Sequence, residues 1–433
     1  MIDLALFRSE PERISRDMRR RGRDADVVDE IVALDTAHRE LVKKLNDLQA
    51  KRNAASKTKP SESARAELKT LSQEVKKYEE GVKEYQEKIE RLLYHVPNLL
   101  ADDVPDGHDE SNNIVVREEG EKRTFDFAPR DYMEIATALN LIDTERAAKV
   151  SGARFGYVKG DLALLEFALV SLCFQTLTDE KQLGPLAKKA HVASTPFIPM
   201  VPPVMIRPDA YRKMARLDPG QEEERFYIQS DDIFLVGSAE HSIGPYYMDE
   251  MVDREKLPIR FIGFSSCFRR EAGSYGKDTH GILRVHQFDK LEMECFVEPE
   301  DAIHEHNFVL SVQELLMQKL GIPYRVVQIC AGDMGTPDAR QFDLDAWMPG
   351  QNTYRETHTA DLMTDYQARR LKTRFKTEQG STEFVHMVDA TAFAIGRTLI
   401  ALIENYQRED GGVDIPKALQ VFMGKRKAIY PQR

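Results

Sequence analysis

The stretch FRREAGSYGKDTHGILRVHQFDKLEM, residues 268–293, decides the fold of the larger part of this 433-residue chain. Its first residues end one predicted strand, and a polar loop with three glycines, 272–281, follows. A second strand returns from Arg284, and alternation puts His286, Phe288 and Glu292 on one of its faces. Strand, loop and strand together predict a β-hairpin of an antiparallel sheet.

The hairpin brings together side chains suited to an anionic ligand with an aromatic ring. The guanidiniums of Arg269 and Arg270 can each bind a phosphate or carboxylate through two parallel hydrogen bonds. Phe288 offers a flat face for a purine, and Glu292 can accept a hydrogen bond from an ammonium or hydroxyl group. The alternative is a salt-bridged surface hairpin, because a polar strand face is commonly the solvent side of an antiparallel sheet.

Further outward, the hydrophobic pattern predicts strands at 226–236, 259–268, 324–329 and 384–388. A helix is predicted at 392–407, where apolar side chains recur at steps of four, three and four. Because few helices separate the strands, this order predicts an α+β domain, an antiparallel sheet flanked by helices.

The first hundred residues carry a different pattern, the heptad repeat of a coiled coil. Apolar residues recur at steps of three and four over 27–48 and again over 68–96, with a polar break at 56–63. This pattern predicts an antiparallel helical hairpin within an N-terminal arm, residues 1–100. Prolines and acidic residues after it predict a linker, 101–120, before a second domain at 121–433.

Charge distinguishes the arm from the rest of the chain. Overall, 61 Lys and Arg against 72 Asp and Glu give a net charge of −11, which excludes a globally basic nucleic-acid binder. Residues 26–95 balance 14 basic against 14 acidic residues, so the arm would tolerate a polyanion best. The alternative is that its cations are the solvated outer positions of any coiled coil. The candidate phosphate contacts are Arg39, Lys43, Lys44, Lys51, Arg52, Lys57 and Lys59.

Other features argue against whole classes of protein. The four cysteines lie far apart and form no CxxC, which argues against a disulfide scaffold or a Cys-rich zinc site and favours a reducing cytoplasm. No 18-residue apolar window predicts a transmembrane helix. The chain also lacks GxxxxGK[ST], a GxGxxG that opens a helix, HExxH and GxSxG, so P-loop, dinucleotide-binding, zinc-protease and serine-hydrolase functions lose their main support.

Two further segments carry candidate ligand-binding residues. Glu356 and Thr359 offer a carboxylate and a hydroxyl, which are hard oxygen donors of the kind Mg²⁺ prefers. Arg397 lies near the start of the predicted helix, where the helix dipole disfavours a cation, and this indicates an anionic partner. The alternatives are a loop without a ligand and a surface ion pair.

Together these segments resemble the class II aminoacyl-tRNA synthetases, and among them the seryl-tRNA synthetase family of bacterial type, over essentially the whole chain. The helical hairpin is similar to that family's tRNA-binding arm, and Val201-Pro202-Pro203 is similar to the dimer-forming first motif of the class. The stretch 268–293 resembles the second motif, and AIGRTLIALIENYQREDG, 394–411, resembles the third. The second and third motifs are long and specific matches.

The resemblance implies an enzyme that activates serine with ATP and transfers it to the 3′-terminal adenosine of tRNA(Ser), and of tRNA(Sec) where present. It implies that 121–433 is the catalytic domain, that the cofactors are ATP and Mg²⁺ without zinc, and that the protein is a cytoplasmic homodimer. The implied ATP-binding residues are Arg269, Arg270, Glu271, Val285, Phe288, Glu356, Thr357, His358, Thr359 and Arg397. The implied serine-binding residues are Ser238, Ala239, Glu240, Arg269, Glu292 and Thr391.

Individual roles follow from the same resemblance. Arg269 would hold the α-phosphate and the serine carboxylate, Phe288 would stack on the adenine, and Arg397 would hold the γ-phosphate. The implied catalytic residues are Arg269, Glu271 and Arg397, and the implied Mg²⁺ ligands, acting with ATP, are Glu356 and Thr359.

The chain departs from the family pattern mainly around the implied amino-acid pocket. Ser238 replaces the usual Thr, and Asp389-Ala390 replaces the usual Asn-Gly. After Glu356 the family usually has Ile-Ser-Ser-Cys-Ser, where this chain has Thr-His-Thr-Ala-Asp, 357–361. His280 stands where Arg is common. These changes bear on amino-acid specificity more than on membership of the class.

Two other hypotheses stay open at this point. A paralogue could activate serine or a related amino acid for a non-tRNA acceptor such as a carrier protein, although such relatives are expected to lack the arm. A non-enzymatic, synthetase-like protein would be expected to have lost Arg269, Glu271, Glu292 or Arg397, and all four are present.

Overall fold

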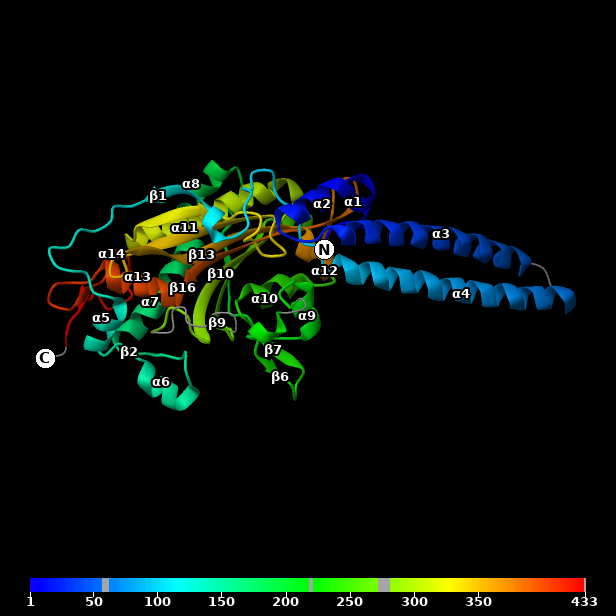
Figure 1. Ribbon diagram of the computed structural model, residues 1–433. Helices are drawn as coiled ribbons and strands as arrows, with labels where there is room; N and C mark the ends of the chain where they lie inside the picture. Colours follow the sequence, from blue (N-terminus) through cyan, green and yellow to red (C-terminus); the bar gives the residue numbers. More distant parts are fainter. Residues whose placement is uncertain (57–61, 218–220, 272–280, 432–433) are drawn as a thin grey trace. The chain divides into compact units, whose positions relative to one another are not determined.

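The computed structural model describes residues 1–56, 62–217, 221–271 and 281–431 (Figure 1). The chain divides into two compact units, Met1–Leu99 and Leu100–Arg433. The division falls where the heptad repeat gives way to acidic, proline-containing sequence.

The described part of the N-terminal unit is helical. Its two long helices run side by side as the predicted hairpin (Figure 1), and their apolar seam is buried at Ile31, Leu45, Val75 and Ile89. The heptad pattern predicted both long helices, because a seam at steps of three and four is buried only when helices pack against each other. The predicted turn at 56–63 lies largely outside the described residues. The helices are α1 (Leu4–Ser9), α2 (Pro11–Arg20), α3 (Asp26–Ala55) and α4 (Glu62–Leu93).

The C-terminal unit is built on a large sheet, and the α+β prediction is confirmed. In the described residues its strands follow the order β1-β11-β12-β13-β16-β10-β9-β4, and every pair except β4–β9 is antiparallel. The hairpin predicted from 268–293 is the β9–β10 pair, in register from Ile259↔Phe296 to Phe268↔Gln287. The strands are β1 (Ile114–Glu119), β4 (Ile198–Met200), β9 (Ile259–Phe268), β10 (Gln287–Val297), β11 (Tyr324–Gln328), β12 (Arg340–Met348), β13 (Thr353–Thr364) and β16 (His386–Ala394).

The two faces of this sheet differ in chemistry. Along β10, the side chains of Leu291, Met293 and Cys295 belong to the main hydrophobic core, while Lys290, Glu292 and Glu294 alternate with them and point to the opposite face. The apolar face packs against α7 (Asp161–Leu177), α11 (Ala302–Leu320) and α13 (Ile395–Asn405). The three polar side chains are also buried, so the polar face is lined by charge that is shielded from bulk water.

Smaller elements surround the sheet. The helices are α5 (Tyr132–Ala138), α6 (Thr144–Ser151), α8 (Glu180–Ala190), α9 (Pro208–Lys213), α10 (Glu240–Ile243), α12 (Tyr366–Leu371) and α14 (Lys417–Gln420). The short strands are β2 (Ile142–Asp143), β3 (Tyr157–Val158), β5 (Met205–Ile206), β6 (Tyr227–Ile228), β7 (Ile233–Leu235), β8 (Met251–Val252), β14 (Arg374–Lys376), β15 (Thr382–Phe384), β17 (Val413–Asp414) and β18 (Ala428–Ile429). In the described ranges no single helix is long and apolar enough to cross a membrane, and only the bent pair α7–α8 passes that test jointly.

Several predicted boundaries are wrong. The predicted linker, 101–120, contains β1, which pairs with β11 at the edge of the sheet, and Leu100 and Val104 join a buried cluster. The single strand predicted at 226–236 is the hairpin β6–β7, and the strand predicted at 384–388 is divided between β15 and β16.

The predicted helix at 392–407 begins only at Ile395, because β16 continues to Ala394 and pairs with β10. A short apolar run such as 392–395 fits a buried strand and a buried helix equally well, and periodicity alone does not separate them.

Candidate active site

Two cavities on the polar face of the sheet collect most of the predicted site residues. The smaller cavity, about 110 Å³, is lined by Arg269, Glu271, Val285, Phe288, Glu356, Thr357, Thr359, Thr391 and Arg397 among others. The larger one, about 220 Å³, is lined by Glu240, Arg269, Glu292 and Thr359 together with residues that were not predicted. Arg269, Lys290 and Thr359 line both cavities, so the two are parts of one continuous site.

Arg269 follows the last residue of β9 and is held in place from three sides. Its backbone N–H donates to the carbonyl of His286 (3.0 Å), and its Nε donates to the carbonyl of Gly237 (3.0 Å). The guanidinium lies 5.3 Å from the ring centroid of Phe288, within range of a cation–π contact. These contacts fix the Nε and the backbone of Arg269, a residue that lines both cavities.

Arg397 and Glu356 form the second charged element of the smaller cavity. Arg397 Nη1 donates to Glu356 Oε1 (2.9 Å) and to the Glu356 carbonyl (2.8 Å). Partial burial would raise the pKa of Glu356, but the guanidiniums of Arg397 and Arg269 outweigh it and hold the pKa below its usual value. Glu356 is therefore an anion at neutral pH, suited to a cation or to a partner that displaces Arg397.

A β-bulge explains why Glu356 and Thr359 share a face although they are three residues apart. Opposite β13, Leu344 pairs with His358 and Asp345 pairs with Glu356, so Thr357 is an extra residue in the strand. The same insertion turns His358 to the core side, where it is fully buried beside Phe393. A regular strand would have placed Glu356 and Thr359 on opposite faces.

Glu292 is the centre of a buried polar network in the larger cavity. Its Oε2 pairs with Lys290 Nζ (2.5 Å) and accepts from Ser238 Oγ (3.4 Å), and its Oε1 accepts from Thr391 Oγ1 (3.4 Å). A second bulge, with Ala392 as the extra residue opposite β10, turns Thr391 toward Glu292 while Phe393 faces the core. Burial raises the pKa of Glu292 to about 8, with Lys290 opposing the rise and Glu240 adding to it.

Glu240 is oriented by a neutral histidine. Burial lowers the pKa of His241 to about 4, so the ring is uncharged at neutral pH. The backbone N–H of Gly237 donates to its Nδ1 (3.1 Å), so the ring proton lies on Nε2 and points to Glu240 Oε1 (3.1 Å). The hydroxyl of Tyr211 also contacts Nδ1 (2.9 Å). Desolvation of Glu240 is outweighed by its polar and charged neighbours, led by His241 and Lys290, and its pKa lies well below the usual value.

Some predicted residues lie outside both cavities. His358 is bonded to the Ala392 carbonyl (3.1 Å) and to Thr357 Oγ1 (2.7 Å), and burial lowers its pKa to about 4. Arg270 lies over the ring of Phe226 (5.6 Å), and Ala239 is buried in a hydrophobic cluster. Ser238 lines neither cavity but touches both Glu292 and Lys290. Residues 272–280, which include His280, are outside the described part.

The larger cavity contains residues that the sequence did not single out for binding. Arg216, Arg225, His241 and Lys290 line it, as do Asp361 and Asp389, which the sequence marked only as departures from a family pattern. The sequence could have pointed to Lys290, because it lies two residues from both Phe288 and Glu292 and therefore shares the polar face of β10 with them. No periodic signal pointed to Arg216 or Arg225, since both lie in irregular sequence between short elements.

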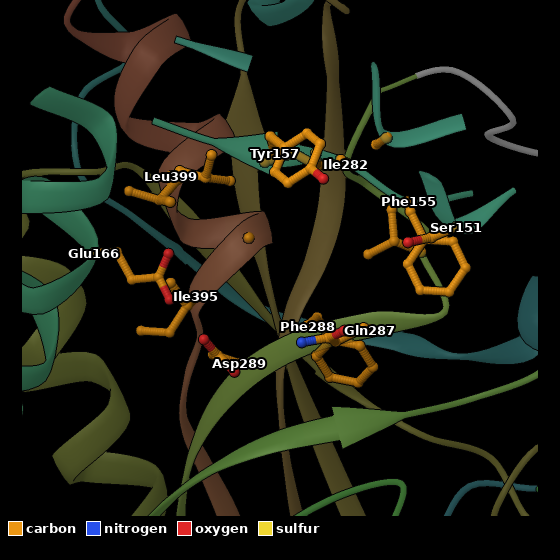
Figure 2. Close-up of a pocket in the computed structure, with 15 residues that line it drawn as sticks. Ser151, Phe155, Tyr157, Glu166, Ile282, Gln287, Phe288, Asp289, Ile395 and Leu399 are labelled. Atoms are coloured by element: carbon orange, nitrogen blue, oxygen red, sulfur yellow. The ribbon is translucent and has the colours of Figure 1, made fainter. Parts of the chain in front are cut away.

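A third cavity, about 280 Å³, adjoins Phe288 and is shown in Figure 2. Gln287 and Asp289, which alternate with Phe288 along β10, line it together with Glu166 of α7. Burial and a hydrogen bond with Asp289 raise the pKa of Glu166 to about 8, so Glu166 keeps its proton at neutral pH. Ser266 Oγ donates to the same aspartate (2.6 Å).

In the arm, the predicted phosphate contacts are mostly exposed. Arg39, Lys43, Lys44 and Lys51 are exposed on α3 and Arg52 is half-buried, while Lys57 and Lys59 lie outside the described residues. Arg39 also pairs with the buried Asp35 (3.1 Å).

Comparison with known proteins identifies the family. Residues 1–100 match the model of the seryl-tRNA synthetase N-terminal domain, and residues 226–406 match the class II tRNA synthetase core domain (G, H, P, S and T). The serine--tRNA ligase of Dictyoglomus thermophilum is 41% identical over 432 residues, which is 98% of each chain. The chain belongs to the seryl-tRNA synthetase family. The serine--tRNA ligase of Thermobifida fusca, 39% identical over 98% of each chain, is a similar match.

Solved structures of seryl-tRNA synthetases share the whole fold. The enzyme from Pyrococcus horikoshii, solved with ATP, is 34% identical and superposes over all of both chains with a TM-score of 0.90. The cytoplasmic enzyme from Naegleria fowleri, solved with AMP, is 32% identical with a TM-score of 0.88 over 100% of this chain and 99% of that one. This member of the seryl-tRNA synthetase family is thus a class II aminoacyl-tRNA synthetase with serine--tRNA ligase activity.

Proposed function

We propose that the two joined cavities hold ATP and serine side by side, with Arg269 between them, and that the chain forms seryl-adenylate there and transfers serine to tRNA(Ser). The observation that carries this proposal is that Arg269 lines both cavities, one of which is also lined by Arg397 and the other by Glu240 and Glu292. In this reaction a serine carboxylate oxygen bonds to the α-phosphorus and pyrophosphate leaves. No protein nucleophile is needed, only positioning and neutralisation of charge.

The smaller cavity suits the nucleotide. Phe288 supplies a flat apolar ring for the adenine, and Val285 lies beside it. Arg269 and Arg397 supply guanidiniums for the α- and γ-phosphates, and Glu271 contributes at the entrance next to Arg284 (3.4 Å). Arg397 is held by Glu356 in the free protein, so phosphate binding exchanges one anionic partner for another.

Magnesium fits the same cavity. Glu356 and Thr359 present a carboxylate and a hydroxyl on one strand face, and these hard oxygen donors suit Mg²⁺. Two protein donors suit an ion that arrives with phosphate and water ligands, and in the described residues no group of three or more His, Cys, Asp and Glu could hold a metal ion by itself. When bound with ATP, Mg²⁺ neutralises charge on the phosphates, and Glu356 and Thr359 would hold it.

The larger cavity suits the amino acid. Glu240 provides a carboxylate and Glu292 provides carboxyl oxygens for the α-ammonium group, and Thr391 and Ser238 are tied to Glu292 by hydrogen bonds. A pocket with buried polar groups discriminates strongly against alanine, because alanine would leave those groups without a partner. Lys290, bonded to Ser238 Oγ (3.0 Å), keeps the network charged and rigid.

The remaining parts of the proposal concern partners and location. We propose that the exposed cations of α3 bind tRNA(Ser). Basic residues balance the acidic ones in the arm, so a polyanion is repelled less there than by the acidic remainder of the chain. Ile198 and Val201 are exposed on and beside the edge strand β4, which supports a homodimer, since exposed apolar sheet edges are protected by association. All four cysteines are free and buried, which suits the cytoplasm.

The test is ATP–pyrophosphate exchange by the full chain with each of the twenty amino acids, followed by charging of tRNA(Ser). Exchange with serine and charging of this tRNA are the expected results. Exchange with serine but no charging would favour a non-tRNA acceptor, and exchange with a different amino acid would contradict the proposed use of the larger cavity.

A further inference from the structure

A row of carboxylates that the proposed serine contacts do not use extends from the lining of the larger cavity into the sheet. Asp361 of β13 lies directly opposite Asp389 of β16, and Asp389 lies directly opposite Glu294 of β10. These three residues, called the acidic row here, occupy adjacent positions on three neighbouring strands and are all buried. Like charges at directly opposed positions of a sheet destabilise it. Such an arrangement therefore indicates a compensating group.

The acidic row has fewer partners than its charge requires. Arg216 Nη2 bonds to Asp389 Oδ2 (3.4 Å), and in the described residues this is the row's one ion pair. Oδ1 of Asp361, which is 7% exposed, has no hydrogen-bond partner, and neither oxygen of Glu294 has one. Burial raises the pKa of all three carboxyls, to about 7 for Asp389, and neighbouring carboxylates, among them Asp338 and Glu240, add to the rise.

Two of these carboxylates line the cavity itself. Asp361 and Asp389 face it, together with Glu240, which is 6% exposed and whose Oε2 also has no partner. Asp361 and Glu240 therefore present buried, unpartnered acceptors to the cavity, and Arg216, whose Nε is also without a hydrogen-bond partner, lines it as well. Buried polar atoms are nearly always paired in folded proteins, so a ligand that brings N–H or O–H groups is favoured here.

The other charged groups of the cavity do not satisfy the row. Lys290 is bonded to Glu292 and Ser238, and the imidazole of His241 is neutral and bonded to Glu240. Arg225 donates its Nε to the carbonyl of Arg216 (3.4 Å) and lies over Tyr211. Arg269 is assigned above to the amino acid's carboxylate. Among the described residues, Asp389 is thus the one member of the acidic row that is bonded to a cation of the cavity, Arg216.

We propose that Asp361 and Asp389 read the amino-acid side chain as a hydrogen-bond donor, so that the cavity accepts a short side chain ending in a primary amine as well as the hydroxyl of serine. The inference rests on the proposed function, in which Glu240 and Glu292 take the α-ammonium and Asp361 and Asp389 are left for the side chain. An ammonium supplies three donors and a positive charge, whereas a hydroxyl supplies one donor and no charge. The substrate class is a short α,β-diamino acid.

Activation of such an amino acid involves the same bond changes as activation of serine. The carboxylate oxygen bonds to the α-phosphorus of ATP, the bond from the α-phosphorus to the bridging oxygen breaks, and pyrophosphate leaves with the electron pair. The side-chain amine keeps its protons and takes no part in the step.

The first test compares L-serine, L-2,3-diaminopropionate and L-alanine in ATP–pyrophosphate exchange by the full-length protein. We expect kcat/KM for diaminopropionate to exceed about one-twentieth of the serine value, and alanine to fall well below both. A diaminopropionate value below that fraction, with serine exchange intact, would overturn this inference and leave the proposed function standing. Absence of serine exchange would instead overturn the proposed function.

The second test uses Asp389→Asn and Asp361→Asn, with Asp249→Asn as a matched control. Asp249 is 54% exposed and pairs only weakly with Lys372 (3.9 Å), outside both cavities. We expect each pocket variant to lower the ratio of diaminopropionate to serine kcat/KM at least about tenfold, since each replaces a carboxyl group that can ionise beside an ammonium by an amide that cannot, while the control leaves the ratio unchanged. An unchanged ratio in both pocket variants would refute the role of the acidic row. The wild-type comparison needs no variant, so it stays decisive if a variant fails to fold.

Discussion

The surroundings of Asp389 predict how the stability of the fold changes with pH. The side chain is buried on β16 between Asp361 and Glu294, and Arg216 is its ion-pair partner. Burial, strengthened by Glu240 and Asp338 and opposed by Arg216, raises its pKa from 3.8 to about 7. Between these values the folded protein keeps a proton that the unfolded chain has lost. Stability therefore falls as the pH rises from about 4 to about 7 and changes no further above that.

The magnitude follows from the width of this pH window. Each pH unit well inside the window corresponds to about 1.4 kcal/mol and the slope halves at the folded-state pKa, so Asp389 alone destabilises the fold by about 2.3 kcal/mol more at pH 7 than at pH 5. The side-chain amide that Asp389→Asn introduces cannot ionise, so the variant should gain this amount over the wild type between the two pH values. For a unit of this size the gain corresponds to a relative rise in Tm of about 3 °C.

Thermal unfolding followed by tryptophan fluorescence is the appropriate assay. The chain has a single tryptophan, Trp347, which lies on β12 in the same sheet as Asp389. The Tm difference between Asp389→Asn and wild type should widen from pH 5 to pH 8, while Asp249→Asn, a change at an exposed carboxylate, should show no such widening. A Tm difference that stays constant over this range would show that Asp389 is ionised throughout and refute the reasoning.

Three other predictions concern the nucleotide site, the core and the arm. Arg397→Ala should abolish serine-dependent pyrophosphate exchange and leave tRNA(Ser) binding in a filter assay within about twofold of wild type. The reason is that phosphate contact is assigned to the C-terminal unit and tRNA contact to the arm, and normal exchange would contradict that assignment. Arg260→Leu should lower the unfolding free energy by about 3–5 kcal/mol, because Glu305, bonded to it at 2.6 and 2.7 Å, would stay buried without a partner. In chemical denaturation, the double variant Arg260→Leu/Glu305→Leu should recover most of this stability, and an equal loss in the single and double variants would refute the reasoning. Replacing the exposed Lys43 and Lys44 together by Glu should raise the KM for tRNA(Ser) at least about tenfold at low salt, because it exchanges two phosphate-binding cations for anions, and should leave pyrophosphate exchange unaltered. An unchanged KM would exclude this part of α3 from the surface that binds tRNA.

The sequence predicted best where one physical signal dominated. The heptad seam of α3 and α4 and the alternation of β9 and β10 both specify burial over many residues, and both were found. Arg269, Glu292 and Arg397 were predicted for the site and do line its cavities. Prediction was poorer where elements are short, as in β6 and β7, or where an acidic segment such as that before β1 is fixed only by pairing with a distant strand.

The residues that sequence reasoning missed share a physical cause. Arg216 and Arg225 lie in irregular backbone, so no period could show that they face a cavity formed by β10, β13 and β16. Asp361 and Asp389 were visible as unusual residues, but that they face each other is a property of strand register, which depends on the whole sheet.

The two β-bulges show why local spacing misleads at this site in particular. In a regular strand, Glu356 and Thr359 would lie on opposite faces, but the extra residue Thr357 puts them on the same face. Thr391 and Phe393 would share a face of a regular strand, but the extra residue Ala392 puts them on opposite faces. Each bulge thereby turns a polar side chain toward the cavities and a side chain one or two residues away, His358 or Phe393, into the core. A regular strand could not place these polar side chains at the cavities and also bury His358 or Phe393 in the core, so the departure from regular alternation is what assembles the site.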